Sequence, residues 1–595
     1  MVDFVSQEYQ RYEVGCNDKF EQCKKIYDHW TGKPPMKTED WHNAVHVPMT
    51  LEAEQTITPR LFSALFPSED PVECRVYDPA TEEQGIIIKS MIKKQFMLSN
   101  VQGEALSALT QCTLYGTGYV EAGWLVERSW QVAPQSGERY YAIVANRNDC
   151  KWVNFFEMYP HPAKLRMADG LPIIRRRFCD AEYLKRLAEN PYLQFKDIDK
   201  ALNSTPVEGI PSHILGPDGK QLELKNREKY EILEYWGPWD MSYMADKEKV
   251  VTKKGVPHCI MVVNRDVLIR GIPNPYNHQK PPFCKLTLFT DAIPNWFGVG
   301  TGTIGKPTQE RINKMVNQRL DNVDLVLNKQ GFYNGNDVLI NTKKLQISQP
   351  GLWHKCSDTV TSIRWMDTPD VTSSSYKEEE IAKADFREST GATVPLMPTD
   401  EGQHRTAQGI NLLQGAAGAR FKPVLRKLET DFIQELATMY LSNLQQFMAV
   451  PEWIDITSAN GAQQPVQVSP EAIQARVQFI PTGISEALNK EVQIGQLLRF
   501  KELTIQDPTI NRAEINKRIG ELMGFKDLHK LVIAQQPMVQ QPGGLNPQDQ
   551  ELIQQRLAEG ADPQAIKMEL LGNAPGQPPM SNQSNQGGAP NAGPG

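Results

Sequence analysis

The sequence has no long hydrophobic run and no secretory leader. None of its 595 residues lies in a stretch that approaches the roughly 18 consecutive apolar residues of a membrane-spanning helix, so we expect no membrane span. The first residues, MVDFVSQEYQRYEV, lack the basic start and apolar core of a signal peptide. We therefore expect a soluble chain that is made and assembled in the cytoplasm.

Cysteine is sparse and unpaired. The nine cysteines are scattered singly from Cys16 to Cys356, with no CxxC pair and an odd total. This pattern favours reduced thiols and argues against a disulfide framework or a thiolate zinc site. The HExxH and GxSxG spacings are also missing, so the sequence assembles neither a metal site nor an activated nucleophile. We expect no cofactor and no catalytic residue.

Positive charge is not in excess, and one region has no charge at all. The formal net charge is −7, which argues against a protein that grips nucleic acid over its whole surface. Any contact with DNA must be local or loose.

Residues 573–595 contain no charged side chain and little besides Asn, Pro, Gly, Gln and Ser, so we expect this tail to be disordered.

The first half of the chain mixes helical and strand patterns. Apolar residues at helical spacing predict helices over 3–30 and 50–66 and one long helix over 81–115, which ends at Gly116. Alternating patterns then predict several strands. These strands cover 119–128, 140–145, 173–178, 230–236, and the pair 260–263 and 267–269 joined by a turn at 264–266. The length allows two to four packed regions, and the fold class is α+β, mainly helical.

A glycine run at 298–305 is the strongest pattern that suggests an enzyme. It fits both GxGxxG and GxxxxGK, but the residue after Lys306 is Pro307, which has no hydroxyl to hold magnesium. No acidic residue ends a second strand to bind a ribose. We favour a flexible hinge before a helix whose first turn contains Pro307. Nucleotide binding stays open as the alternative.

The residues after this helix form a compact insert and then a second helix. The insert, 331–367, contains a predicted strand at 337–340 and several aromatic residues, which are more often local core than interface. A capping box at Ser375 and Glu378 predicts the start of the second helix. A loop over 389–404, a long helix over 406–448 and further helical patterns at 485–503 and 512–533 follow.

The cluster Arg175-Arg-Arg177 allows two interpretations. Three arginines could contact phosphates, but on an alternating strand such a cluster is more often a solvated edge or an ion-pair partner for a neighbouring subunit. We favour the second interpretation.

Several segments, and their order along the chain, resemble the portal proteins of tailed bacteriophages, especially the larger portals of the short-tailed group. The segment GVGTGTIGKPTQERINKMVNQRLDNVDLVLN at 298–328 carries most of the resemblance. LSALTQCTLYGTGYVEAGW, VLIRGIPNPY, STGATVPLMPTDEGQHRTAQGI and ARFKPVLRKLETDF add to it. The resemblance extends over most of residues 40–450, and the region 450–595 adds little.

The resemblance implies a division of the chain into wing, stem, clip and crown. It implies an N-terminal wing at 1–297, a first stem helix at 298–330, a clip at 331–370, a second stem helix at 371–390, a tunnel loop at 391–405, a long wing helix at 406–450, a crown at 451–534 and a C-terminal tail at 535–595. These parts would form a ring, about a dozen copies in this family.

The function implied by the resemblance is that of a DNA conduit at a unique capsid vertex, not an enzyme. The ring would be the channel for genome packaging and ejection, and would bind the major capsid protein and scaffold, the terminase large subunit, and later the head-tail adaptor and tail proteins. Double-stranded DNA would pass through without sequence-specific contact. The location would be the virion. A nucleotide-dependent packaging enzyme and a structural connector without DNA contact are the alternatives.

Three sets of candidate site residues follow from the resemblance. Carboxylates of the stem helices would line the channel: Glu378, Glu379, Glu380, Asp385, Glu388, Asp321 and Asp324. Because a ring repeats an acidic stripe by symmetry, such a wall would repel phosphates and let DNA slide. The tunnel-loop candidates are Pro395, His404 and Arg405, and the clip candidates for partner docking are Phe332, Tyr333, Trp353, Arg364 and Trp365.

Overall fold

A computed structural model describes the greater part of the chain and divides it into two compact units, Met1–Val492 and Gln493–Gly595. The described residues are 1–67, 72–78, 81–134, 136–188, 194–205, 230–246, 249–328, 330–345, 353–366, 369, 372–392, 420–457, 463–481, 497–501, 515–516 and 518–520. Those of the second unit are short helical pieces, in which Ile515 and Ile519 are buried.

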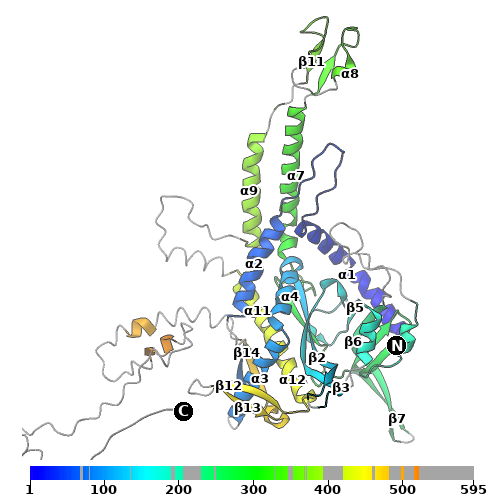
Figure 1. The fold of residues 1–595 in the computed structure, drawn as a ribbon, viewed down its shortest axis with the longest axis vertical. Coiled ribbons are helices and arrows are strands. Elements are labelled where there is room, and N and C mark those ends of the chain that lie inside the picture. The colour runs from blue at the N-terminus through cyan, green and yellow to red at the C-terminus, as the bar shows by residue number, and fades with distance from the viewer. Residues whose placement is uncertain are drawn as a thin grey trace, which may run out of the picture. The chain divides into compact units, whose positions relative to one another are not determined.

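Four helices open the first unit (Figure 1). The predicted first two are confirmed as α1 (Val2–Trp30) and α2 (Met49–Leu65). The prediction of one helix over 81–115 is wrong, because α3 (Glu82–Leu98) and α4 (Val101–Tyr115) are separate. The break is at Asn100, whose left-handed backbone (φ 50°) a helix interior cannot contain, and asparagine is among the few residues that adopt it readily.

The predicted stop at Gly116 is confirmed. Gly116 closes α4 with φ 91°, and β2 (Thr117–Val132) begins at the next residue. This strand lies between β3 (Arg139–Val153) and β9 (Phe283–Thr287) in an antiparallel sheet.

The other predicted strands and one that was not predicted, β4, form a five-stranded antiparallel sheet, in chain order. It consists of β4 (Met158–Pro160), β5 (Ile173–Cys179), β6 (Tyr230–Asp246), β7 (Lys249–Val263) and β8 (Val267–Pro273). The predicted turn joins β7 to β8, and its residues Asn264 and Arg265 both have positive φ. Helices α5 (Ala181–Ala188) and α6 (Ile198–Leu202) follow β5.

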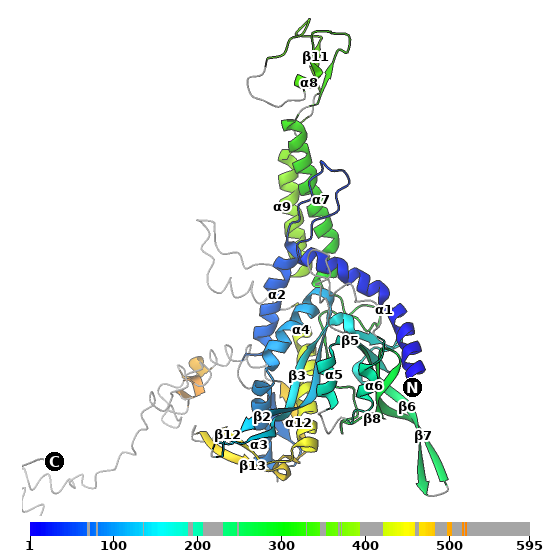
Figure 2. The same ribbon diagram turned by 45° about the vertical axis from the view of Figure 1, so that its right-hand side comes forward.

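Two helices, α7 (Thr301–Leu327) and α9 (Thr372–Thr390), lie side by side as a hairpin (Figures 1 and 2). The prediction that Pro307 lies in the first turn is wrong, since α7 begins at Thr301 and contains Pro307 in its interior. Between the helices lie β10 (Gly331–Tyr333), α8 (Thr342–Leu345) and β11 (Ile363–Trp365). The strand predicted at 337–340 is wrong, because the chain makes turns there.

The last part of the first unit returns to the N-terminal helices. Helices α11 (Lys422–Leu428) and α12 (Glu435–Phe447) are joined by a π-helical segment, Glu429–Gln434, so the described part of the predicted long helix is confirmed. Residues 406–419 of that helix are outside the described ranges. The strands β12 (Glu452–Thr457), β13 (Gln463–Val468) and β14 (Val477–Pro481) were not expected, and β14 pairs with β1 (Val72–Val76).

One continuous core joins these elements. Aromatic rings from α1, β2 and the loop before α7 meet at its centre. The centroid of the Phe20 ring lies within 5.5 Å of the ring centroids of both Phe155 and Tyr159. The ring of Tyr119 accepts a hydrogen bond at its hydroxyl from Trp296. This core fixes the base of the α7–α9 hairpin. Within the described ranges no helix is both long enough and apolar enough to cross a membrane.

Candidate functional site

The glycine run before and within α7 serves close packing. A Cβ on Gly300 would collide with the carbonyl of Leu114, and one on Gly302 with Ile26. Gly305 faces the ring of Phe386 on α9 with no room for a side chain. The Cβ positions of these three glycines are therefore filled by other parts of the protein, so close packing accounts for the glycines. The hinge expected here is instead a tightly packed helix start.

An irregular segment, residues 43–48, and the first turn of α2 are fixed along α7 by side-chain amides. Gln309 accepts from the backbone N–H of Thr50 and donates to the carbonyl of Val47 at 2.6 Å. Asn313 accepts from Val47 N–H, and Asn317 both accepts from and donates to the backbone of Val45. We call these three buried side chains the amide ladder.

Sequence analysis missed the amide ladder, although a signal was present. Gln309, Asn313, Asn317 and Asp321 recur every fourth residue, which places them on one face of a helix. Asp321 extends the ladder by accepting from Asn43 N–H at 2.7 Å, and Asp324 accepts from the Asn43 side chain. Two of the channel candidates are therefore engaged within the subunit.

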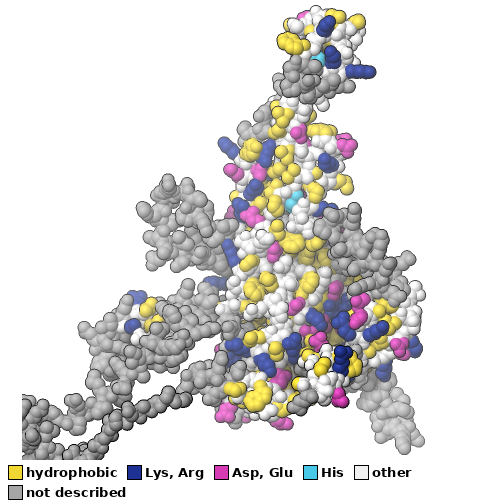
Figure 3. Space-filling model, viewed as in Figure 1, with side chains coloured by type: hydrophobic (Ala, Val, Ile, Leu, Met, Phe, Trp, Pro, Cys, Tyr) yellow, Lys and Arg dark blue, Asp and Glu magenta, His cyan; other side chains and the backbone are white. Residues whose placement is uncertain are grey.

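Most of the acidic residues of α9 are also paired within the hairpin. Arg311 of α7 donates to Glu378 at 3.0 Å and lies 3.9 Å from Asp385. Arg319 donates to Glu379 at 2.6 Å, and Lys383 lies at the same distance from the other oxygen. On the face shown in Figure 3, basic and acidic side chains alternate along the hairpin.

Glu379 has a shifted pKa, and two other carboxylates of α9 differ from it in exposure. Burial opposes the ionisation of Glu379, but hydrogen bonds from Lys383 and Arg319 outweigh it and lower its pKa. Glu380 and Glu388 are exposed to solvent. They are the channel candidates whose charge the hairpin leaves most accessible.

The insert between the helices exposes its aromatic residues. Phe332 is 67% exposed, Trp365 63% and Trp353 92%, so the preference for local core is wrong. Tyr333 and Arg364 are exposed as well. These five side chains are the predicted clip candidates, and all are accessible to a partner.

A carboxylate holds the two halves of the insert together. Asp337 accepts hydrogen bonds from the N–H and hydroxyl of Ser357 and from the hydroxyl of Ser362. These donors lower the pKa of Asp337, so it stays ionised. The side chains thus compensate for an insert that has little core. The tunnel-loop candidates Pro395, His404 and Arg405 lie outside the described residues.

Arg175, Arg176 and Arg177 form buried ion pairs inside the subunit. Arg175 donates to Glu121 at 2.6 Å and to Glu157 at 3.0 Å. Arg176 donates to Glu231 at 2.5 Å. Their strand, β5, pairs with β6 along its length and with β4 as far as Arg175, and Arg177 lies 3.8 Å from Glu234. Because all three arginines pair with carboxylates of their own subunit, the prediction of a solvated edge or an intersubunit pair is wrong.

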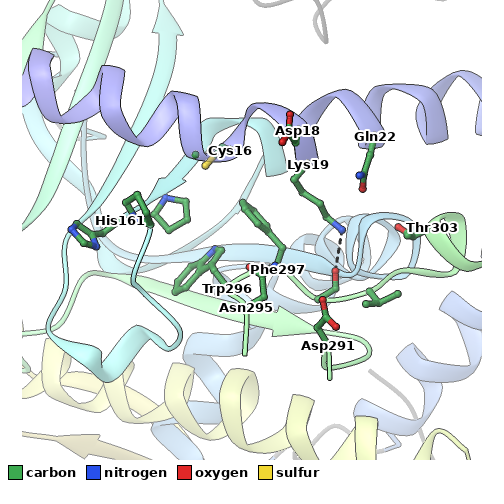
Figure 4. Close-up of a pocket in the computed structure, with 15 residues that line it drawn as sticks. Cys16, Asp18, Lys19, Gln22, His161, Asp291, Asn295, Trp296, Phe297 and Thr303 are labelled. Atoms are coloured by element: carbon green, nitrogen blue, oxygen red, sulfur yellow. Dashed lines mark hydrogen bonds between the residues drawn. The ribbon is translucent and has the colours of Figure 1, made fainter. Parts of the chain in front are cut away.

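A pocket of about 360 Å³ lies between α1 and the loop before α7 (Figure 4). Lys19 extends across it and donates to the carbonyl of Gly298 at 3.1 Å, and burial lowers the pKa of this lysine. Asp291, His161 and Thr303 line other parts of the wall. Since its lysine is committed to the backbone, we assign this pocket no reaction. Among the described residues, no group of three or more metal-binding side chains comes together.

The family model described as phage SU10 portal protein matches residues 211–566, more than half of the chain. The chain therefore belongs to the phage SU10 portal protein family. The match includes the α7–α9 hairpin and also most of the region after 450, which had seemed to add little to the resemblance. No curated protein matches the chain.

Family membership establishes the general function. The chain is a bacteriophage portal protein, and the portal protein family is structural rather than enzymatic. Its place is the viral capsid.

Proposed function

We propose that the chain assembles into a ring, about a dozen copies, at one capsid vertex of a short-tailed phage and forms the channel through which DNA is packaged and ejected. The observation that carries this proposal is the α7–α9 hairpin. Its base is fixed in the core and its far end presents an insert with exposed aromatic side chains.

We assign the parts of the chain to the functions of a portal as follows. The hairpin is the stem, residues 331–370 are the clip, and the sheets with α1–α6 and α11–α12 are the wing. The crown begins after 450, and the tunnel loop is 391–405. The wing and crown bind capsid protein and scaffold. The clip binds the terminase large subunit during packaging and the head-tail adaptor afterwards.

A channel of this kind needs weak contact with DNA. A wall with many lysines and arginines would hold DNA by releasing counterions, and would slow its passage. In the stem, Arg311 and Arg319 pair with Glu378 and Glu379, which offsets their positive charge, while Lys314 and Lys377 are exposed to solvent. The exposed carboxylates Glu380 and Glu388 add negative charge. This balance supports a wall along which DNA slides.

The mass of the purified chain and its negative-stain image test the ring. We expect rings with a central hole at about twelve times the chain mass. A monomer at every salt concentration, even with scaffold protein added, would contradict the proposal.

A deletion of residues 331–367, closed by a short Gly-Ser linker, tests the clip. We expect rings that no longer retain terminase or adaptor in a pull-down. Removal of the charge-free residues 573–595 is the control and should leave both interactions intact. Clip-deleted rings that bind both partners normally would disprove the assignment.

A further inference from the structure

The part of the clip between Gly331 and Met366 carries an excess of basic side chains. Residues 331–366 contain four basic side chains against two carboxylates. The basic ones are all exposed: Lys343, Lys344, Lys355 and Arg364. This excess is unlike the chain as a whole, whose net charge is −7. Two further carboxylates, Asp367 and Asp370, follow in the sequence before α9 and lie outside the described residues.

The two carboxylates of this part of the clip have internal partners. The oxygens of Asp337 are occupied by Ser357 and Ser362. Asp358 accepts from the N–H of Val360 and from the hydroxyl of Thr361, at 3.0 and 2.7 Å. These oxygens are therefore committed to the turns that shape the clip. Because these donors are neutral, both carboxylates keep their negative charge, and the four basic side chains leave residues 331–366 with a net charge of +2.

The basic and aromatic side chains are interleaved. In the ladder of β10 and β11, Phe332 is directly opposite Arg364, so both project from the same face. Trp365 is opposite Gly331, and its ring lies 3.2 Å from where a Cβ on that glycine would be. The glycine thus leaves space for the indole ring. Figure 3 shows basic and hydrophobic side chains together at this end of the molecule.

We propose that the clip docks a protein surface that offers apolar contacts to its exposed aromatic side chains and carboxylates to its exposed basic side chains. Protein interfaces characteristically bury aromatic side chains at their centre and place charged groups at the rim. Duplex DNA satisfies only half of this surface, because its bases are stacked inside and its exterior offers phosphates but no apolar patch for Phe332, Trp353 and Trp365. The proposal rests on the proposed role of the clip in docking and specifies the chemistry of its partner.

Binding of a labelled dodecapeptide that alternates Glu and Leu tests this chemistry on the full-length chain. We expect binding that weakens as salt rises from about 50 to about 300 mM. The quadruple variant K343E/K344E/K355E/R364E should lose about tenfold or more in affinity. Trp353→Ser should weaken binding without changing its salt dependence. The control K185E/R186E changes two exposed basic residues of α5 and should bind as the wild type does.

The variants are checked for folding by a second probe. The quadruple variant should bind a Lys-Leu dodecapeptide more tightly than the wild type does, a gain that an unfolded clip would not give. Equal losses in the quadruple variant and the control would overturn the proposal. Tighter binding of a duplex of about 30 base pairs than of the Glu-Leu peptide would also overturn it and would indicate a nucleic-acid surface instead. If clip-deleted rings lose terminase while the quadruple variant binds the peptide normally, only the inferred chemistry fails.

Discussion

Glu231 is a fully buried carboxylate on which two arginine side chains converge. Arg176 donates to one oxygen at 2.5 Å, and Arg265 donates to both at 2.8 and 3.0 Å. The ring of Tyr9 lies against both guanidinium groups. The carboxylate therefore joins α1, β5 and the β7–β8 turn through charge as well as packing.

Glu231→Ala should destabilise the subunit by about 3 to 5 kcal/mol, because two largely buried arginines lose the anion that compensates their desolvation. Thermal unfolding of the purified chain measures the effect. Glu73→Ala is the control, since Glu73 forms an exposed pair with Lys89 whose loss should cost less than about 1 kcal/mol. Similar shifts in the two variants would show that the buried cluster contributes no more than a surface pair.

Gly305 of α7 lies against the ring of Phe386 of α9, with no room for a Cβ. Gly305→Ala should cost about 1 to 3 kcal/mol, because its Cβ would displace the buried ring of Phe386. Gly335→Ala is a suitable control, since nothing lies within 4 Å of its added methyl. Thermal unfolding of both variants compares them. If both alanines are tolerated equally, the helices are free to separate at this point.

The residues of the arginine cluster and of the glycine run were visible in the sequence, but their roles were not. The role of Arg175 depends on Glu121 and Glu157, which lie on other elements, and a central strand cannot be distinguished from an edge strand by its own residues. The glycine run matched a phosphate-binding pattern because close backbone approach needs the same residue type in both cases. Whether the backbone approaches a phosphate or another part of the protein depends on the tertiary structure, which the local sequence does not show.

At the scale of elements, the amide ladder attaches residues 43–50 to the stem. Asn313→Ala should leave the Val47 N–H without its acceptor and so cost about 1 to 3 kcal/mol. Hydrogen exchange should accelerate at 45–50 in this variant. Gln318→Ala, an exposed amide on the same helix, should change nothing there. Unaltered exchange in Asn313→Ala would mean that other contacts hold the segment.

The same segment should respond to acid through His46. Its Nδ1 lies 3.1 Å from the Asn313 amide nitrogen, and its ring stacks on His29, which is 3.8 Å from Glu310. Burial, with the neighbouring His29 as a second cause, lowers the pKa of His46. Burial also lowers the pKa of His29, although Glu310 opposes this and Lys306 adds to it.

The sign of the pH effect follows from these shifts. Each histidine has a folded pKa below its unfolded value, so the unfolded chain binds more protons and stability falls as pH drops below about 6.5. We expect the melting temperature to fall between about pH 7.5 and 5.5, and His46→Gln to reduce this fall. The exposed His354→Gln should leave it unchanged. An equal fall in all three proteins would assign it to other groups.

Elements whose apolar residues recur at a regular spacing could be predicted from the sequence, but the points where these elements begin or break could not. The stem helices follow from apolar spacing, but the start of α7 at Thr301 depends on Gly300 and Gly302 fitting against Leu114 and Ile26. The break at Asn100 depends on one residue in a left-handed conformation. Of the strands after 450, β12 and β13 pair with each other, but β14 pairs with the distant strand β1, so its partner could not be read from local pattern.

At the scale of the whole molecule, symmetry decides what a charged face does. A pair such as Arg311 with Glu378 contributes little net field in a ring, because every copy repeats both charges. An exposed carboxylate such as Glu380 adds its negative charge to the field once for every copy in the ring. The original set of channel candidates therefore divides into residues that bind their own subunit and residues that could act on DNA.

The double variant E380K/E388K should slow packaging while leaving ring assembly intact, because each added lysine offers a phosphate contact in every copy and the contacts multiply around the ring. Packaging by wild-type and variant rings in the same terminase reaction gives the rates, and the slowing should diminish as salt rises. E82K/E83K, on exposed positions of α3, makes the same charge change in the wing and is the control. Equal rates for all three proteins would mean that Glu380 and Glu388 face away from the channel. Slowing by E82K/E83K as well would attribute the effect to overall charge, since only a residue on the channel wall meets the DNA at each step.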